Sequence, residues 1–131
     1  MAVAKEHNYG DVLWSRGVFN AMLIAEGARN AILEFGGTIT GKEMRWGLEH
    51  INLTEERLAE LGAKGFGQPF TVTCADHEGN GPVLFQEWDG EKWVIVSAWI
   101  EPMREIVRPM LEQAAATEAE KWNYTMRDDC T

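Results

Sequence analysis

Apolar residues in the first third of the chain recur at steps of three and four, which is the spacing of one face of an α-helix. Between Asp11 and Phe35 the repeat runs through five positions: Val18, Met22, Ala25, Ala28 and Ile32. Gly36-Gly37 follows, and glycine readily takes the left-handed conformation that ends many helices. The pattern therefore predicts one long amphipathic helix from Asp11 to Phe35.

Two shorter helices are predicted from capping signals. Thr40 stands three positions before Glu43, the spacing at which a threonine and a glutamate cap each other's backbone N–H groups. A second helix is therefore expected from about Gly41. Its apolar stripe is made of Met44, Leu48 and Ile51. Thr54, followed by two glutamates that complement the helix dipole, predicts a third short helix that ends at Gly62.

Beyond the glycine-rich stretch 62–67, apolar and polar residues alternate, which is the period of a half-buried strand. Phe70, Val72 and Cys74 share one face of such a strand. Two further runs, 83–88 and 92–99, are rich in β-branched and aromatic residues. Between them lies Asp89-Gly90, a signal for a two-residue type I′ hairpin turn. We therefore expect a three-stranded sheet that contains this hairpin.

A last helix is expected near the end of the chain. Pro102 and Pro109 mark its start, and it runs to about Trp122. Its inner face is made of Met110, Leu111 and Ala114. The 131 residues are the usual size of one domain. We expect a single α/β domain over residues 1–131, with loose ends at 1–8 and 123–131.

Charge and composition exclude several kinds of partner. The formal net charge of −9, from 21 acidic and 12 basic residues, repels nucleic acid and anionic lipid surfaces. The longest apolar stretch, 18–28, is interrupted by polar residues and glycine, so it falls short of the roughly 20 residues of a membrane-spanning helix. The first residues lack the basic start and apolar centre of a secretory signal. As written, the chain is expected in the cytoplasm.

No common catalytic or nucleotide-binding motif is present, so we expect neither an enzyme nor a bound cofactor. The densest polar cluster, Asp76-His77-Glu78, allows two interpretations. It is a metal or acid/base site, or a wide turn whose charged side chains face water, and we favour the turn. Cys74 and Cys130 fit no CxxC redox pair or zinc knuckle. They form one disulfide or are two unrelated thiols.

Six tryptophans allow a stacking platform for sugars or bases. Four of them, Trp88, Trp93, Trp99 and Trp122, fall in or near the hairpin and the last helix, where aromatic side chains usually pack. Packing is therefore their favoured role. Trp14 differs because it lies where the first helix begins, and helix N-termini offer unpaired N–H groups to anions such as a carboxylate. A tryptophan that simply points inward is the alternative.

Three segments together resemble a known family: residues 10–31 (GDVLWSRGVFNAMLIAEGARNA), 40–62 (TGKEMRWGLEHINLTEERLAELG) and 71–102 (TVTCADHEGNGPVLFQEWDGEKWVIVSAWIEP). They are similar to the closing third of type 1 periplasmic solute-binding proteins that serve ABC importers of branched-chain amino acids and amides. The similarity extends from about Tyr9 to Cys130. It depends on the order and spacing of the segments, together with the turn at 89–93.

The resemblance implies a partial periplasmic-binding-protein-like fold from a two-lobed receptor that presents a ligand to an ABC permease. The ligand would be an aliphatic amino acid, a short amide or urea. Val12, Leu13 and Trp14 would contribute an apolar wall to its cleft. The implied setting is the periplasm, where disulfides persist, and this favours a bridge between Cys74 and Cys130.

The N-terminal two thirds of that family have no counterpart in this sequence. Faces that would meet the missing strands are then exposed, which predicts self-association into a homo-oligomer. Two other functions compete with ligand binding. One is an interaction or scaffold protein without a ligand, and the other is a small metal-dependent enzyme that uses Asp76, His77 and Glu78.

Overall fold

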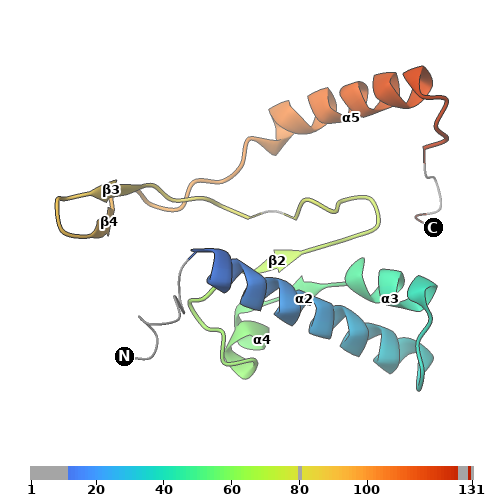
Figure 1. Ribbon diagram of the computed structural model, residues 1–131, viewed down its shortest axis with the longest axis horizontal. Helices are drawn as coiled ribbons and strands as arrows, with labels where there is room; N and C mark the ends of the chain where they lie inside the picture. Colours follow the sequence, from blue (N-terminus) through green and yellow to red (C-terminus); the bar gives the residue numbers. More distant parts are fainter. Residues whose placement is uncertain (1–11, 80, 127–129, 131) are drawn as a thin grey trace. The chain divides into compact units, whose positions relative to one another are not determined.

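The computed structural model describes residues 12–79, 81–126 and 130 (Figure 1). The sequence predicts one domain, whereas the structure divides the chain into two compact units, Met1–Gly79 and Asn80–Thr131. We call these unit 1 and unit 2. The expected loose N-terminal end, and positions 127–129 and 131 of the expected C-terminal one, lie outside the described residues.

Unit 1 contains the three predicted helices, labelled in Figure 1 as α2 (Val12–Phe35), α3 (Gly41–Leu48) and α4 (Glu55–Glu60). The glycines after α2 take positive φ values of 76° and 44° and end that helix. The predicted capping box of α3 is confirmed. The Thr40 amide donates to Glu43 Oε2 at 2.6 Å, and the Glu43 amide donates to Thr40 Oγ1 at 3.3 Å.

Helices α2 and α3 lie side by side at two buried glycines, Gly27 and Gly47 (Figure 1). A Cβ atom added at Gly47 would run into the backbone carbonyl of Gly27 and would lie 3.0 Å from the Ala31 Cβ. The contact therefore depends on the absence of a side chain at this point, which lets two helix backbones approach closely.

A short strand that the sequence did not reveal, β1 (Asn52–Leu53), pairs antiparallel with β2 (Phe70–Thr71). The strand expected at 70–74 is thus shorter than predicted, and its partner is β1 rather than the hairpin. The core of unit 1 forms around this pair, from Ile51, Leu53, Leu58 and Ala63. Partly buried residues surround it: Met22, Leu23, Leu48, Phe70 and Val72.

The buried face of α2 is rotated away from the predicted stripe. Its buried residues are Glu26, Gly27 and Ala31, whereas the predicted positions Ala25 and Ile32 are exposed. The predicted stripe counted apolar positions only, so it left out Glu26. In the structure an arginine from another helix neutralises that glutamate, so it is buried without a lone charge.

Unit 2 contains the predicted hairpin, formed by β3 (Gln86–Trp88) and β4 (Trp93–Ile95) in antiparallel register. The three-stranded sheet is wrong, since the described residues form two separate two-stranded sheets. The type I′ turn is also wrong. Gly90 has a φ of 107°, but Asn123 is the only described non-glycine residue with positive φ, so Asp89 does not meet the requirement of that turn.

The turn instead depends on the side chain of Asp89. Its Oδ1 atom accepts the amide N–H groups of Glu91 and Lys92 at 2.8 and 2.9 Å. These two donors favour the ionised carboxylate and lower the pKa of Asp89 below its usual value. The loop from Asp89 to Lys92 is therefore longer than the two residues predicted, and it still returns the chain into the hairpin.

The last helix, α5 (Arg104–Lys121), forms where the sequence predicts it, with Pro109 inside it. Its expected inner face is wrong. Met110 and Leu111 are 65% and 47% exposed, and no described residue of α5 is buried. The four tryptophans expected to pack are likewise about half exposed or more, although Trp88 and Trp93 touch edge to face with ring centroids 5.7 Å apart.

Candidate functional site

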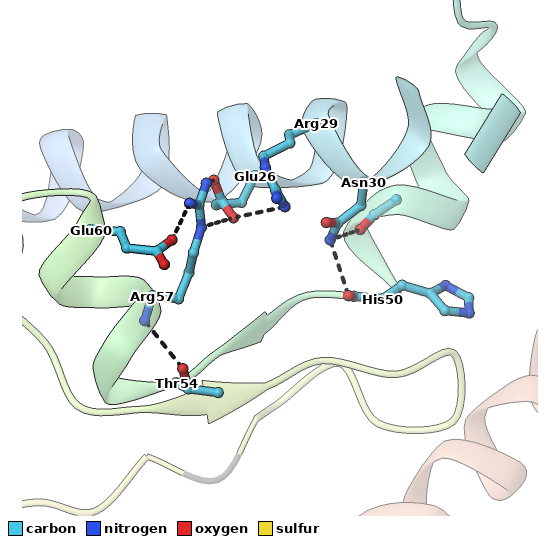
Figure 2. A network of polar contacts seen from close by, with 8 residues as sticks. Glu26, Arg29, Asn30, His50, Thr54, Arg57 and Glu60 are labelled. Atoms are coloured by element: carbon cyan, nitrogen blue, oxygen red, sulfur yellow. Dashed lines mark hydrogen bonds and ion pairs between the residues drawn. The ribbon is translucent and has the colours of Figure 1, made fainter. Parts of the chain in front are cut away.

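A polar network in unit 1 joins α2 to α4 (Figure 2). Arg57 on α4 donates from Nε to Glu26 Oε2 at 2.9 Å and from Nη2 to Glu26 Oε1 at 2.5 Å. Its remaining amino group donates to Glu60 Oε2 at 2.8 Å. Arg29 adds a more distant positive charge, 3.9 Å from Glu26 Oε2. The amide of Arg57 donates to Thr54 Oγ1, which fixes the start of α4.

The charges in this network hold one another in their ionised forms. The hydrogen bonds from Arg57 lower the pKa of Glu26, and the positive charges of Arg57 and Arg29 add to this against the opposing effect of burial. The same bonds, together with the one to Glu60, raise the pKa of Arg57. A carboxylate held in this way is a poor general acid or base near neutral pH. The network therefore holds α2 and α4 together, and we call it the Glu26 clamp.

A second set of contacts ties α2 to the end of α3. Asn30 donates from Nδ2 to the His50 carbonyl at 3.0 Å and to the Gly47 carbonyl at 3.4 Å (Figure 2). The His50 ring stacks on Trp46 with centroids 3.8 Å apart, and its Nδ1 lies 2.7 Å from the Trp46 carbonyl. His50 is exposed. These contacts satisfy carbonyl groups at a helix end.

The polar cluster at 76–78 forms a turn, in line with the favoured interpretation. The amide of Asp76 donates to the Thr73 carbonyl at 3.1 Å, and Asp76 Oδ1 accepts the Glu78 amide at 3.1 Å. His77 Nε2 lies 3.2 Å from Oε1 of the buried Glu49. Among the described residues, no group of three or more His, Cys, Asp or Glu side chains could hold a metal ion.

The residues expected to bind a ligand lie in the first turn of α2. Val12 and Leu13 are 74% and 75% exposed, and Trp14 is 43% exposed. The structure places them on the surface but does not show what they bind, so their role stays a prediction. Neither Cys74 nor Cys130 is a free thiol in the structure, and the bridge expected between them stays a prediction.

A hollow that sequence reasoning missed lies beside α4, in the glycine-rich stretch. It measures about 190 Å³, and its lining comprises Glu55, Leu58, Lys64, Gly65, Gly67, Gln68 and Pro69. Pockets for small ligands usually have volumes of ~300–1,000 Å³. This hollow is smaller. In the sequence its glycines indicated only a loop, so the hollow was not predicted.

Comparison with known proteins gives one informative match. No protein-family model matches the sequence, and the curated protein sequences contain no significant match. A crystal structure described as an ABC transporter permease from the Pseudomonas fluorescens group is similar, with a TM-score of 0.82 and 37% sequence identity. The match covers 94% of this chain but only 30% of that chain. This chain thus spans less than a third of the length of the similar protein.

The match corrects the expected identification. The sequence was interpreted as the closing third of a periplasmic solute-binding protein, and this is wrong because the similar protein is described as a permease. The substrate-binding function inferred from the resemblance is withdrawn with it. The association with ABC transporters agrees with the match, which also names a transport protein rather than an enzyme. Among the described residues, no helix combines the length and apolar character needed to cross a membrane.

Proposed function

We propose that this chain is a non-enzymatic component of an ABC transporter. The observation that carries the proposal is the permease match, at 37% identity over 94% of the chain with a TM-score of 0.82. Backbone similarity of this extent, together with this identity, is expected of related proteins rather than of a shared motif. This chain spans only 30% of the similar protein, so the activity of that whole protein is proposed for this chain as part of the same proposal.

The geometry of unit 1 supports a structural rather than a chemical role within such a transporter. Its buried carboxylates, Glu26 and Glu49, both have cationic or histidine neighbours within 4 Å. Groups that are already paired are poorly placed to exchange protons with a substrate. Unit 1 would therefore be a rigid scaffold that positions the surfaces in contact with other parts of the transporter.

A segment exchange tests the proposal. In the Pseudomonas fluorescens group protein, the matched 30% is replaced by this chain, and the chimera is purified with the ATP-binding subunit that defines this class of transporter. We expect the chimera to co-purify with that subunit as well as the parent protein does. A control chimera carries Leu53→Ala, which weakens this scaffold. A folded chimera that no longer assembles would contradict the proposal.

Two finer expectations accompany the proposal as predictions. One is a small-molecule ligand, an amino acid, amide or urea, held with the help of Trp14. Ligand at about 100 times its dissociation constant stabilises a protein by about 2.7 kcal/mol. Ligand binding can therefore be measured as a rise in melting temperature, in the wild type and in Trp14→Ala. The other is a homo-oligomer, which light scattering over a range of concentrations detects.

A further inference from the structure

The hairpin of unit 2 carries exposed apolar side chains on both of its faces. The register pairs Trp88 with Trp93 and Gln86 with Ile95, so Trp88, Trp93 and Ile95 share one face. The alternate positions place Phe85, Val94 and Val96 on the other face, together with Glu87, which lies opposite Val94. The exposed fractions of the six apolar side chains lie between 37% and 63%. Strands with two apolar faces are typical of sheets covered by other layers on both sides.

The edges of the hairpin are unpaired as well. β3 pairs with β4 alone, and no third described strand joins this sheet. A lone two-stranded hairpin is at best marginally stable in water, and its free edges readily pair with further strands. The hairpin thus presents exposed apolar side chains on both faces, and neither of its edges pairs with another strand among the described residues.

Helix α5 adds an apolar stripe in the same unit. Ile106, Val107, Met110 and Leu111 recur at helical spacing and are 45–65% exposed. No other described helix or strand of unit 2 packs against α5. Most helices in proteins gain their stability from packing of an apolar face, since isolated helices of this length are marginal.

We propose that the hairpin and the α5 stripe form a docking surface for the part of the transporter that corresponds to the remainder of the similar permease. The argument rests on the proposed function and on chain length. The match covers 94% of this chain, too much to leave out unit 2, yet about 70% of the similar chain lies outside it. That protein therefore contains a large body of polypeptide that can supply strands to the open edges and layers to both faces.

The shape and charge of the surface favour this partner over two others. A membrane surface covers one face of a hairpin only, and the net charge of −9 opposes binding to anionic lipid. A symmetric second copy buries the same patch on both subunits, which leaves the opposite face of the hairpin open. A partner that inserts the hairpin into a layered sheet covers both faces at once.

Co-expression tests the docking surface. This chain is produced together with the remaining ~70% of the Pseudomonas fluorescens group protein as a separate polypeptide. We expect a one-to-one complex in size-exclusion chromatography with light scattering. Hydrogen exchange at 83–100 and 104–121 should slow at least about tenfold in that complex, since covering the faces protects these amides.

Two pairs of variants locate the contact. Ile95→Lys and Met110→Lys place a charge on the hairpin face and on the α5 stripe, and each should weaken the complex at least about tenfold. Glu91→Lys in the hairpin loop and Ala116→Lys on another side of α5 are the matched controls and should change the affinity less than about twofold. Circular dichroism of the free variants verifies that the helices of unit 1 persist.

Three outcomes would overturn the docking surface. They are the absence of a complex with the separate polypeptide, a homodimer that covers the hairpin in place of the complex, and binding of the chain to anionic vesicles through α5. The chimera experiment is independent of these. If the complex forms but the chimera does not assemble with the ATP-binding subunit, the transporter function fails while the docking surface stands.

Discussion

Units 1 and 2 contain similar fractions of apolar residues, but among the described residues only unit 1 buries any of them. In unit 1, Ile51, Leu53 and Leu58 are at most 3% exposed and form a core with the flanking helices. In unit 2 no described residue is buried, although the hairpin and α5 are rich in tryptophan, isoleucine and valine. The difference shows that apolar composition alone does not make a core. A core also needs elements that face one another across it.

The two units also differ in the ion pairs that they form. Unit 1 buries Glu26 and neutralises it with Arg57 from a helix 31 positions away. The described ion pairs of unit 2 join residues three or four apart on α5, such as Arg108 and Glu112. Pairs of the first kind define tertiary structure, whereas surface pairs of the second kind contribute a few tenths of a kcal/mol to one helix.

The largest effect is expected in the core of unit 1. Leu53→Ala removes the side chain of a residue that is 1% exposed and should destabilise the chain by about 2–5 kcal/mol, measured by chemical denaturation. Leu33→Ala on α2 is the matched control, because Leu33 is 69% exposed and the change should cost less than about 0.5 kcal/mol. Equal losses at both positions would contradict the assignment of the core.

The glycine contact between α2 and α3 should be nearly as sensitive. Gly47→Ala forces a methyl group into the backbone of α2 and should destabilise by about 3 kcal/mol, at the upper end of overpacking effects. Gly17→Ala has the opposite expectation. Nothing lies within 4 Å of its added Cβ, so alanine should stabilise α2 by about 0.5–1 kcal/mol. Thermal unfolding of the two variants gives shifts of opposite sign.

The Glu26 clamp should have an intermediate effect that depends on pH. Glu26→Gln should cost about 2 kcal/mol at neutral pH, less than for a fully buried pair because the Arg57 side chain is 23% exposed. The folded-state pKa of Glu26 lies below its ordinary value near 4.5. Its stabilisation is therefore present above the unfolded-state pKa and is lost as pH falls through the folded-state pKa.

Melting temperatures of the wild type and Glu26→Gln should accordingly converge as the pH is lowered into the acid range. Glu34→Gln, on the same helix but exposed, is the control and should parallel the wild type. A wild-type advantage that persists at the lowest pH would rule out the ion pair as its source.

The smallest effect is expected in unit 2. Ile95→Ala and Met110→Ala remove side chains that are 59% and 65% exposed, so each should change the stability of the free chain by less than about 0.5 kcal/mol. A loss of 2 kcal/mol or more would show that unit 2 has a core of its own. That result would remove the contrast between the units.

The sequence by itself determined the local elements of this protein. Glycines after Phe35, the capping box at Thr40 and the Thr54 cap defined α2, α3 and α4 because these signals act within a few residues. The hairpin was equally local. Its turn type was not, because the Asp89 side chain replaced a second positive φ with two hydrogen bonds.

The tertiary structure decided what depends on residues far apart in the chain. The buried face of α2 followed from Arg57, and β1 became a strand only through pairing with β2. The exposed faces of unit 2 followed from the lack of a covering layer among the described residues of that unit. Residue patterns state how apolar an element is. Which face is covered depends on a partner surface, and that partner is specified elsewhere in the chain or in another one.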